Sequence, residues 1–170
     1  WLVEAAGLRL LCDPLLGESH HCGVFEVVPR REVDATALRA DFILVSHRHP
    51  DHFDVESLDR LARLDPDAVV VTADALICAV ATRLGFRNVQ QVAPGSSIDL
   101  DGVRLVTTPS IDPREWGVMI GCDGAAAWNQ VDTVLEGPAD VVRVRDAALA
   151  SLGVAQVGFA AVRWQPMLEI

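Results

Sequence analysis

The sequence lacks any long hydrophobic run, and this absence excludes one class of protein. No uninterrupted apolar stretch approaches the roughly eighteen residues that a membrane-spanning helix requires. Repeats of solenoid length, low-complexity tracts and flexible linkers are lacking as well. Hydrophobic residues still make up 51% of the 170-residue chain, which is enough to build a core. We therefore expect one soluble globular domain without a membrane span.

Basic residues are scarce. The chain has 14 of them against 24 acidic residues, which gives a formal net charge of −10, and it contains no lysine-rich run. A field of this sign repels the phosphates of nucleic acids and the headgroups of anionic membranes. We therefore expect no nucleic-acid partner.

Cysteine is also scarce. The chain has four cysteines, and no Cys-x-x-Cys pair occurs among them. The spacing specifies neither a zinc ribbon nor a disulfide framework, so Cys12, Cys22, Cys78 and Cys122 are predicted to be buried free thiols. Free thiols are typical of a reducing compartment, and we expect a cytoplasmic location.

The two ends of the chain lack the usual terminal features. Neither an initiator methionine nor a signal peptide opens the sequence, and no polar tail closes it. We expect a piece of a longer protein, truncated at both ends, whose partners include further domains of that protein. A missing strand before Trp1 would leave either an exposed sheet edge or a partner strand from another chain, so a homo-oligomer is the alternative to further domains.

The first half of the chain alternates strand and helix patterns. A hairpin over residues 2–12, turning at Ala6-Gly7, is followed by a surface loop over 15–31 and a short helix over 34–39. The run 42–45 is apolar on both faces, as in a central strand. Beyond it the pattern predicts helix 55–64 capped by Asp54, strand 69–72, helix 74–84 ending at Gly85, and strand 89–92.

Hairpins dominate the second half. The Asp-Gly pairs at 101–102 and 123–124 predict hairpins over 97–108 and 117–128. A helix over 145–152 and a strand over 155–162 complete the expected elements. Strands mixed with helices that can cover the outer sheet faces predict a layered α/β sandwich.

The most informative stretch follows the central strand at residues 42–45. Three imidazoles and a carboxylate, those of His47, His49, Asp51 and His52, occur within six residues. Imidazole nitrogen and carboxylate oxygen suit zinc, iron and manganese, and the end of a strand can direct several side chains to one point. The pattern predicts a metal site here. His20 and His21 lie in the predicted loop and are interpreted as solvated residues rather than ligands.

The pattern His-x-His-x-Asp-His after a strand resembles the signature of the metallo-β-lactamase superfamily. Residues 45–54 match that signature, and Asp13-Pro14 after the strand at 8–12 resembles the branch of the ascorbate-6-phosphate lactonases and the N-acylphosphatidylethanolamine phospholipase D. The resemblance implies a four-layer αβ/βα sandwich. It implies one domain over residues 1–170, with halves at about 1–93 and 94–170.

The resemblance also implies a ligand set. His47 and His49 would bind one metal, and Asp51 and His52 a second. A later aspartate bridges both metals in the family, often within Gly-Asp-Thr, and Asp132 before Thr133 stands in the corresponding place. The cofactor would be one or two divalent ions, with zinc expected first and iron or manganese as alternatives.

The chain departs from the family in having no histidine after His52. The family supplies one histidine after the strand that ends near residue 108, where only Asp112, or more weakly Ser110, can substitute. The family's last histidine falls at residues 162–166, which offer no good ligand. Asp112, His20, His21 or residues beyond the ends of the chain would have to complete the site.

Three functions are compatible with this site. The first is a hydrolase in which a metal-activated water attacks an ester, lactone or phosphodiester of a small molecule, with Asp51 as proton acceptor. The second is an iron-dependent oxygenase or hydroxylase on the same fold, which a carboxylate-rich ligand set favours. The third is a degenerate domain that binds metal without catalysis. We expect an enzyme, and the hydrolase first.

Overall fold

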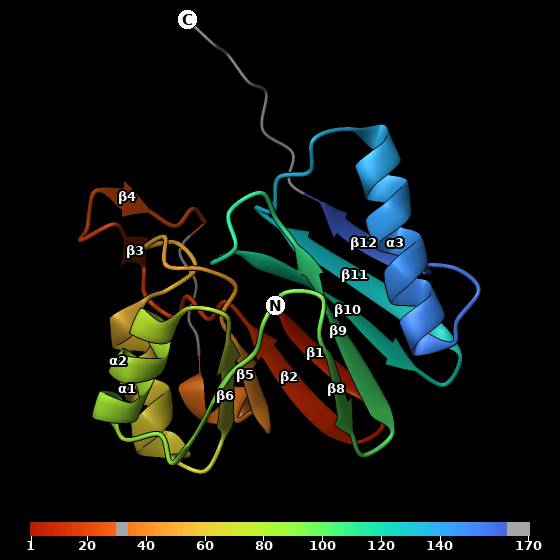
Figure 1. Ribbon diagram of the computed structural model, residues 1–170. Helices are drawn as coiled ribbons and strands as arrows, with labels where there is room; N and C mark the ends of the chain where they lie inside the picture. The colour runs from red at the N-terminus through yellow and green to blue at the C-terminus, as the bar shows by residue number, and fades with distance from the viewer. Residues whose placement is uncertain (30–33, 163–170) are drawn as a thin grey trace, which may run out of the picture. The chain divides into compact units, whose positions relative to one another are not determined.

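The computed structural model describes residues 1–29 and 34–162. The chain divides into two compact units, Trp1–Ala93 and Pro94–Ile170, and each has its own sheet (Figure 1). Within the described part of the chain, no helix has the length and apolar character needed to cross a bilayer.

The sheet of the first unit has five strands in the order β1-β2-β5-β6-β7. They are β1 (Leu2–Ala5), β2 (Leu8–Cys12), β5 (Phe42–Leu44), β6 (Val69–Thr72) and β7 (Asn88–Gln91). β1 and β2 form the predicted antiparallel hairpin, and the pairs β2–β5, β5–β6 and β6–β7 are parallel. Since parallel strands end at the same edge of a sheet, the segments that follow β2, β5 and β6 emerge side by side.

Both helices predicted in this unit are present, with their caps. α1 (Val55–Leu64) begins after Asp54, whose side chain accepts a hydrogen bond from the backbone N–H of Ser57. α2 (Ala75–Leu84) begins after Asp74 and ends at Gly85, whose φ of 108° lies in the region that favours glycine. These local signals were sufficient because capping depends on neighbours in the sequence.

One face of the sheet packs against both helices. Ile43 and Val70 on the strands contact the cluster that includes Leu58 of α1 and Ile77 of α2, and all four side chains are buried. The alternate residues Leu44 and Val71, which point to the other face, are buried as well, and burial on both faces explains the continuous apolar runs of β5 and β6. The resulting layer holds the carboxyl ends of the strands in a rigid position.

The segment predicted as a loop over 15–31 contains a small hairpin, which corrects that prediction. β3 (Ser19–His20) and β4 (Phe25–Glu26) pair antiparallel, and His21 and Cys22 between them have positive φ. Two-residue strands are too short to show an alternating pattern, so no periodic signal marks them in the sequence. The helix predicted over 34–39 is a 3-10 turn, η1 (Ala35–Leu38).

The sheet of the second unit also has five strands, in the order β12-β11-β10-β9-β8. They are β8 (Ser97–Leu100), β9 (Val103–Pro109), β10 (Trp116–Cys122), β11 (Ala125–Val131) and β12 (Phe159–Val162). The two predicted Asp-Gly hairpins are confirmed as the antiparallel pairs β8–β9 and β10–β11. β11 is longer than predicted and ends directly before Asp132.

One helix, α3 (Pro138–Leu152), packs on this sheet (Figure 1). Val144 and Leu149 of the helix contact Met119 and Trp128 of the strands. The predicted helix over 145–152 therefore starts too late: Pro138 occupies the first turn, where a proline needs no hydrogen-bonded N–H, although a Gly-Pro pair suggested a loop. The strand predicted over 155–162 is also too long, since β12 begins at Phe159.

The mixed α/β class predicted from the sequence is confirmed. The prediction of four buried thiols is wrong in part. None of the four cysteines forms a disulfide, but Cys12 alone among them is fully buried, and Cys22 is exposed on the β3–β4 turn. Partial burial raises the pKa of the Cys78 thiol above its usual value, and the nearby carboxylate of Asp74 adds to the effect.

Candidate metal centre

The candidate metal centre lies at the carboxyl edge of the parallel strands in the first unit. β5 is the middle strand of this sheet, and its continuation through Val45 and Ser46 remains buried up to His47. In open α/β sheets, ligands bind at the carboxyl ends of such strands. The predicted His-x-His-x-Asp-His motif therefore lies at the edge of the sheet where ligand-binding sites are usually found.

The three imidazoles of the motif gather at this edge. The ring of His47 lies 4.4 Å from that of His49 and 4.3 Å from that of His52, measured between centroids. His47 Nε2 and His49 Nδ1 face each other at 2.7 Å. His47 is buried, whereas His49 is exposed, so this pair opens from the protein interior toward the surface.

A second pair of ligand atoms is formed by the Asp-His end of the motif. A backbone turn, in which the N–H groups of His52 and Phe53 both donate to the carbonyl of His49, brings His52 back toward the strand end. His52 Nε2 then lies 3.5 Å from Asp51 Oδ2. Asp51 is the more exposed of the two, with 39% of its side chain accessible.

Behind the imidazoles lies the carboxylate of Asp13, which follows β2. Asp13 Oδ1 accepts a hydrogen bond of 2.8 Å from the backbone N–H of Ser46, and Oδ2 accepts one of 2.8 Å from the Ser46 hydroxyl. Asp13 Oδ2 also lies 3.0 Å from His52 Nδ1, and the Ser46 Oγ lies 3.0 Å from His47 Nδ1. Asp13 and Ser46 therefore contact the Nδ1 atoms of His52 and His47, whose Nε2 atoms face Asp51 and His49.

Sequence reasoning gave neither Asp13 nor Ser46 a role. The available signal was the Asp13-Pro14 pair, which ends β2 and which resembles a branch of the superfamily. Asp13 also has a φ of 44°, in the left-handed region that non-glycine residues rarely adopt. Such backbone conformations cluster at functional sites, although the sequence does not show them.

The other side of the motif is fixed by Arg48. Its guanidinium forms a bidentate ion pair with Asp74, with distances of 2.6 and 2.9 Å, and Asp74 also accepts a hydrogen bond from the N–H of Leu76 in α2. Asp74 is buried, so this pair links the motif to the start of α2. The strand-end turn is thus anchored by Asp13 after β2 and by Asp74 after β6.

The two candidate aspartates of the second unit follow β11 and β9. Asp132 comes directly after Val131, a β-branched residue with a φ of 55°. Glycine takes that conformation readily, and the family pattern places glycine there. The segments after β9 and β11 are joined because the backbone N–H of Val134 donates to Ser110 Oγ and that of Ile111 donates to the Val134 carbonyl.

Asp112 is engaged in an ion pair of its own. Its carboxylate accepts hydrogen bonds from the guanidinium and from the backbone N–H of Arg114. A role as ligand would require this pair to open or the carboxylate to be shared.

His20 and His21 contact each other and Phe25 in the small hairpin, with the two Nδ1 atoms 2.8 Å apart. The part of residues 162–166 in which the last family histidine was sought lies, from 163 on, outside the described residues.

The residues of the first unit suit a divalent metal. Two imidazole nitrogens face each other, and a third imidazole lies beside a carboxylate oxygen, so the ligand atoms of each pair are close enough to share one ion. This donor set of nitrogen and oxygen fits zinc, iron and manganese. The Nδ1 atoms of His47 and His52 lie against hydrogen-bond partners, as is usual for metal-binding histidines.

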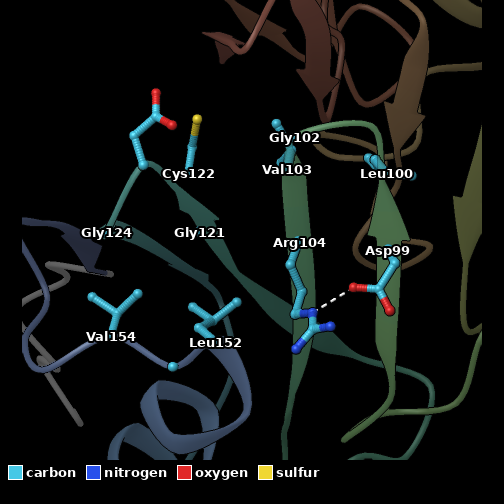
Figure 2. Close-up of a pocket in the computed structure, with 12 residues that line it drawn as sticks. Asp99, Leu100, Gly102, Val103, Arg104, Gly121, Cys122, Gly124, Leu152 and Val154 are labelled. Carbon is cyan, nitrogen blue, oxygen red and sulfur yellow. Dashed lines mark hydrogen bonds and ion pairs between the residues drawn. The ribbon is translucent and has the colours of Figure 1, made fainter.

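The second unit contains a separate polar cleft of about 310 Å³ (Figure 2). Its walls include the Asp99–Arg104 ion pair on one side and Leu152 and Val154, at and beyond the end of α3, on the other. The β10–β11 turn borders this cleft, whereas Asp132 follows the opposite end of β11. The cleft is therefore distinct from the segment that carries Asp132.

The fold and the strand-end cluster together define a protein of mixed α/β architecture with a candidate metal site. The profile of the family described as "Beta-lactamase superfamily domain" matches residues 1–142. The chain belongs to this family, and the predicted resemblance to the metallo-β-lactamase superfamily is confirmed.

Among the proteins of similar sequence, some are named as iron-sulfur proteins and others as metal-dependent hydrolases. A protein of Mycolicibacterium smegmatis, provisionally named Rieske 2Fe-2S iron-sulfur protein, is 28% identical over 183 residues, which cover 99% of this chain and 34% of that protein. A metal-dependent hydrolase of Salinibacter ruber is 31% identical over 100 residues, which cover 58% of this chain and 38% of the relative. The chain thus spans about a third of the length of these relatives.

Solved structures share the fold. CmlA, a diiron beta-hydroxylase from Streptomyces venezuelae, superposes with a TM-score of 0.68 at 20% identity, covering 85% of this chain and 30% of that one. An isothiocyanate hydrolase from Delia radicum gut bacteria superposes with a TM-score of 0.66 at 18% identity, covering 90% and 65%. At these identities the likeness establishes the metallo-β-lactamase fold and nothing about the reaction.

Proposed function

We propose that this chain is the metal-binding domain of a hydrolase that cleaves an ester, lactone or phosphodiester in a small molecule. The observation that carries the proposal is the gathering of three imidazoles and the Asp51 carboxylate at the end of β5. Membership of the beta-lactamase superfamily and a relative named metal-dependent hydrolase support it.

His47 and His49 are proposed to hold the first metal, and Asp51 and His52 the second. Asp132 is proposed as the bridging carboxylate contributed by the second unit, because it directly follows β11 and Val131 before it has a positive φ, which glycine adopts readily. Asp112 remains a secondary proposal as a ligand, in competition with its ion pair to Arg114. Zinc is the metal proposed first.

A divalent metal bound at such a site supplies a Lewis acid and lowers the pKa of a bound water toward neutrality. The chain's own residues have separate tasks. Asp51 is partly exposed and carries a second carboxylate oxygen besides the one near His52, so it can accept the proton of an attacking water. The buried ring of His47 has its position fixed by Ser46, so this ligand of the first pair is held in place without a metal.

Metal content and turnover test the proposal together. The 170-residue chain would be loaded with Zn²⁺, Fe²⁺ or Mn²⁺, desalted, analysed for metal and assayed with nitrophenyl esters, lactones and a nitrophenyl phosphodiester. We expect retained metal and hydrolysis, both lost in the His47→Ala/His49→Ala double variant. His20→Ala is the matched control, because His20 contacts His21 and Phe25 instead of the cluster. A wild-type chain that retains no metal would refute the proposal.

A second function, that of an iron-dependent hydroxylase, is favoured by one observation. The mycobacterial relatives that match 99% of this chain carry the name of a Rieske iron-sulfur protein, and such clusters transfer electrons. The cysteines of this chain are scattered, so a cluster of this type would belong to another part of a longer protein. Preferential retention of iron, a visible absorption band and oxygen consumption with an added reductant would favour this function. Colourless metal with hydrolytic turnover would favour the hydrolase.

A further inference from the structure

We infer that Asp13 is a positioning residue that sets the tautomers of His47 and His52, so that both rings present Nε2 to a metal. The inference rests on the proposed metal site, but its first test needs no metal. It starts from a single carboxylate, 10% exposed, that contacts His52 directly and His47 through the Ser46 hydroxyl.

The direction of each hydrogen bond follows from what each group can donate. An ionised carboxylate only accepts, so the contact of 3.0 Å between Asp13 Oδ2 and His52 requires the proton of that ring on Nδ1. A neutral imidazole carries one proton on its ring nitrogens. His52 Nε2 is then unprotonated, and its lone pair can bind a metal. This nitrogen is the one that lies 3.5 Å from Asp51 Oδ2.

The same reasoning extends to His47 through Ser46. The serine hydroxyl has one hydrogen, and it donates that hydrogen to Asp13 Oδ2 at 2.8 Å. Toward His47 Nδ1, 3.0 Å away, the hydroxyl oxygen can therefore only accept. His47 then also carries its proton on Nδ1, and its bare Nε2 is the atom that faces His49 at 2.7 Å.

Asp13 is well placed to control both rings because its own position is strongly determined. It follows β2, which pairs in parallel with β5, and its backbone N–H donates to the carbonyl of Leu44 at 2.9 Å. The backbone of Asp13 has a φ of 44°, and the backbone N–H of Ser46 donates a hydrogen bond to Oδ1 of its side chain. One carboxylate thus links the first half of the motif, at His47, with the second half, at His52.

Replacement by asparagine gives a sharp test. The backbone N–H of Ser46 is always a donor, so the amide of Asp13→Asn must keep its oxygen at the Oδ1 position and place its NH₂ group at the Oδ2 position. A donor then faces His52 Nδ1, and this favours the opposite tautomer with the proton on Nε2. The ring would keep its place while losing the lone pair that binds a metal.

The first experiment is long-range proton–nitrogen NMR of the metal-free, nitrogen-15-labelled chain at about pH 8.5, where imidazole is ordinarily neutral. We expect the Nδ1–H tautomer for His47 and His52 in the wild type. In Asp13→Asn, His52 changes to the Nε2–H tautomer, and His47 changes as well, because the Ser46 hydroxyl then accepts from the amide and donates its hydrogen to His47 Nδ1. In Ser46→Ala, His47 loses its fixed tautomer and His52 retains it. A wild-type His52 in the Nε2–H form, or unchanged tautomers in Asp13→Asn, would overturn the inference.

The second experiment measures Zn²⁺ affinity by competition with a chelator. Loss of such a partner typically weakens metal binding by about 10–100-fold, and we expect this for Asp13→Asn. Asp74→Asn is the matched control, because Asp74 anchors the same turn through Arg48 without contacting an imidazole in the hydrogen bonds described above. It should leave the tautomers unchanged. Equal loss of affinity in both variants would mean that Asp13 acts only by anchoring the turn and would overturn the inference.

The two proposals can fail separately. A wild-type chain that binds no metal would refute the proposed function, and the tautomers of the metal-free wild type would still decide the role of Asp13. If Asp13→Asn does not fold, as judged by circular dichroism, the wild-type spectrum and the Ser46→Ala variant still give the decisive observations.

Discussion

At the scale of single residues, two residues beside proposed functional segments have unusual backbone conformations. Asp13 and Val131, with φ of 44° and 55°, lie in the left-handed region. Aspartate tolerates this region moderately, whereas a β-branched valine does so poorly. Asp13 contacts the imidazole of His52, and Val131 directly precedes Asp132. Strain of this kind persists where the surrounding structure determines the backbone.

Val131→Gly tests whether the strain at this position is real. Glycine adopts positive φ freely, whereas an L-residue with a Cβ there is disfavoured by about 1–2 kcal/mol. Val131→Ala is the control, since it removes the valine side chain but keeps the Cβ. We expect the glycine variant to be more stable than the alanine variant by about 1 kcal/mol in urea unfolding. Equal stability of the two variants would argue against a strained backbone before Asp132.

At the scale of elements, local signals predicted most helices and hairpins, and tertiary packing decided the rest. The caps at Asp54, Asp74 and Gly85 involve near neighbours, and the sequence was enough to place both helices of the first unit. The start of α3 at Pro138 and the β3–β4 hairpin were missed, because the first resembled a loop and the second was too short for a periodic pattern.

The close packing of β10 against β9 and β11 predicts a large effect of one added methyl group. A Cβ at Gly117 would lie 2.7 Å from Thr108 Oγ1 and 2.9 Å from the backbone oxygen of Asn129, which cannot move without shifting β11. We expect Gly117→Ala to lower the free energy of unfolding by about 1–3 kcal/mol. In the control Gly121→Ala, the Cβ meets the end of the Leu152 side chain, which can rotate away. The control should therefore lose less stability, and the reverse order would contradict this account.

At the scale of the whole molecule, the chain consists of two compact units, each with its own sheet and at least one packed helix. The imidazoles belong to the first unit, and Asp132 belongs to the second. If the proposed bridge exists, metal binding depends on both units. The aligned regions make up 34% and 38% of the length of two of the relatives.

Asp132→Ala tests this dependence. We expect the variant to release one metal equivalent from a chain loaded with two, since a bridging carboxylate contributes to both ions. Asp101→Ala is a matched control, because it removes an exposed carboxylate at the β8–β9 turn and changes the net charge equally. Metal analysis after desalting gives the result, and unchanged metal content in Asp132→Ala would rule out the bridge.

The sequence by itself determined the family, the mixed α/β class and the candidate metal ligands among residues 47–52, because an apolar strand followed by clustered imidazoles is a local pattern. Only the tertiary structure showed that Asp13 contacts Ser46 and His52, and that Asp74 contacts Arg48. These partners lie 26 to 39 residues apart in the chain. They meet because β2, β5 and β6 are parallel and end at one edge, an arrangement that depends on strand order and register rather than on neighbouring residues.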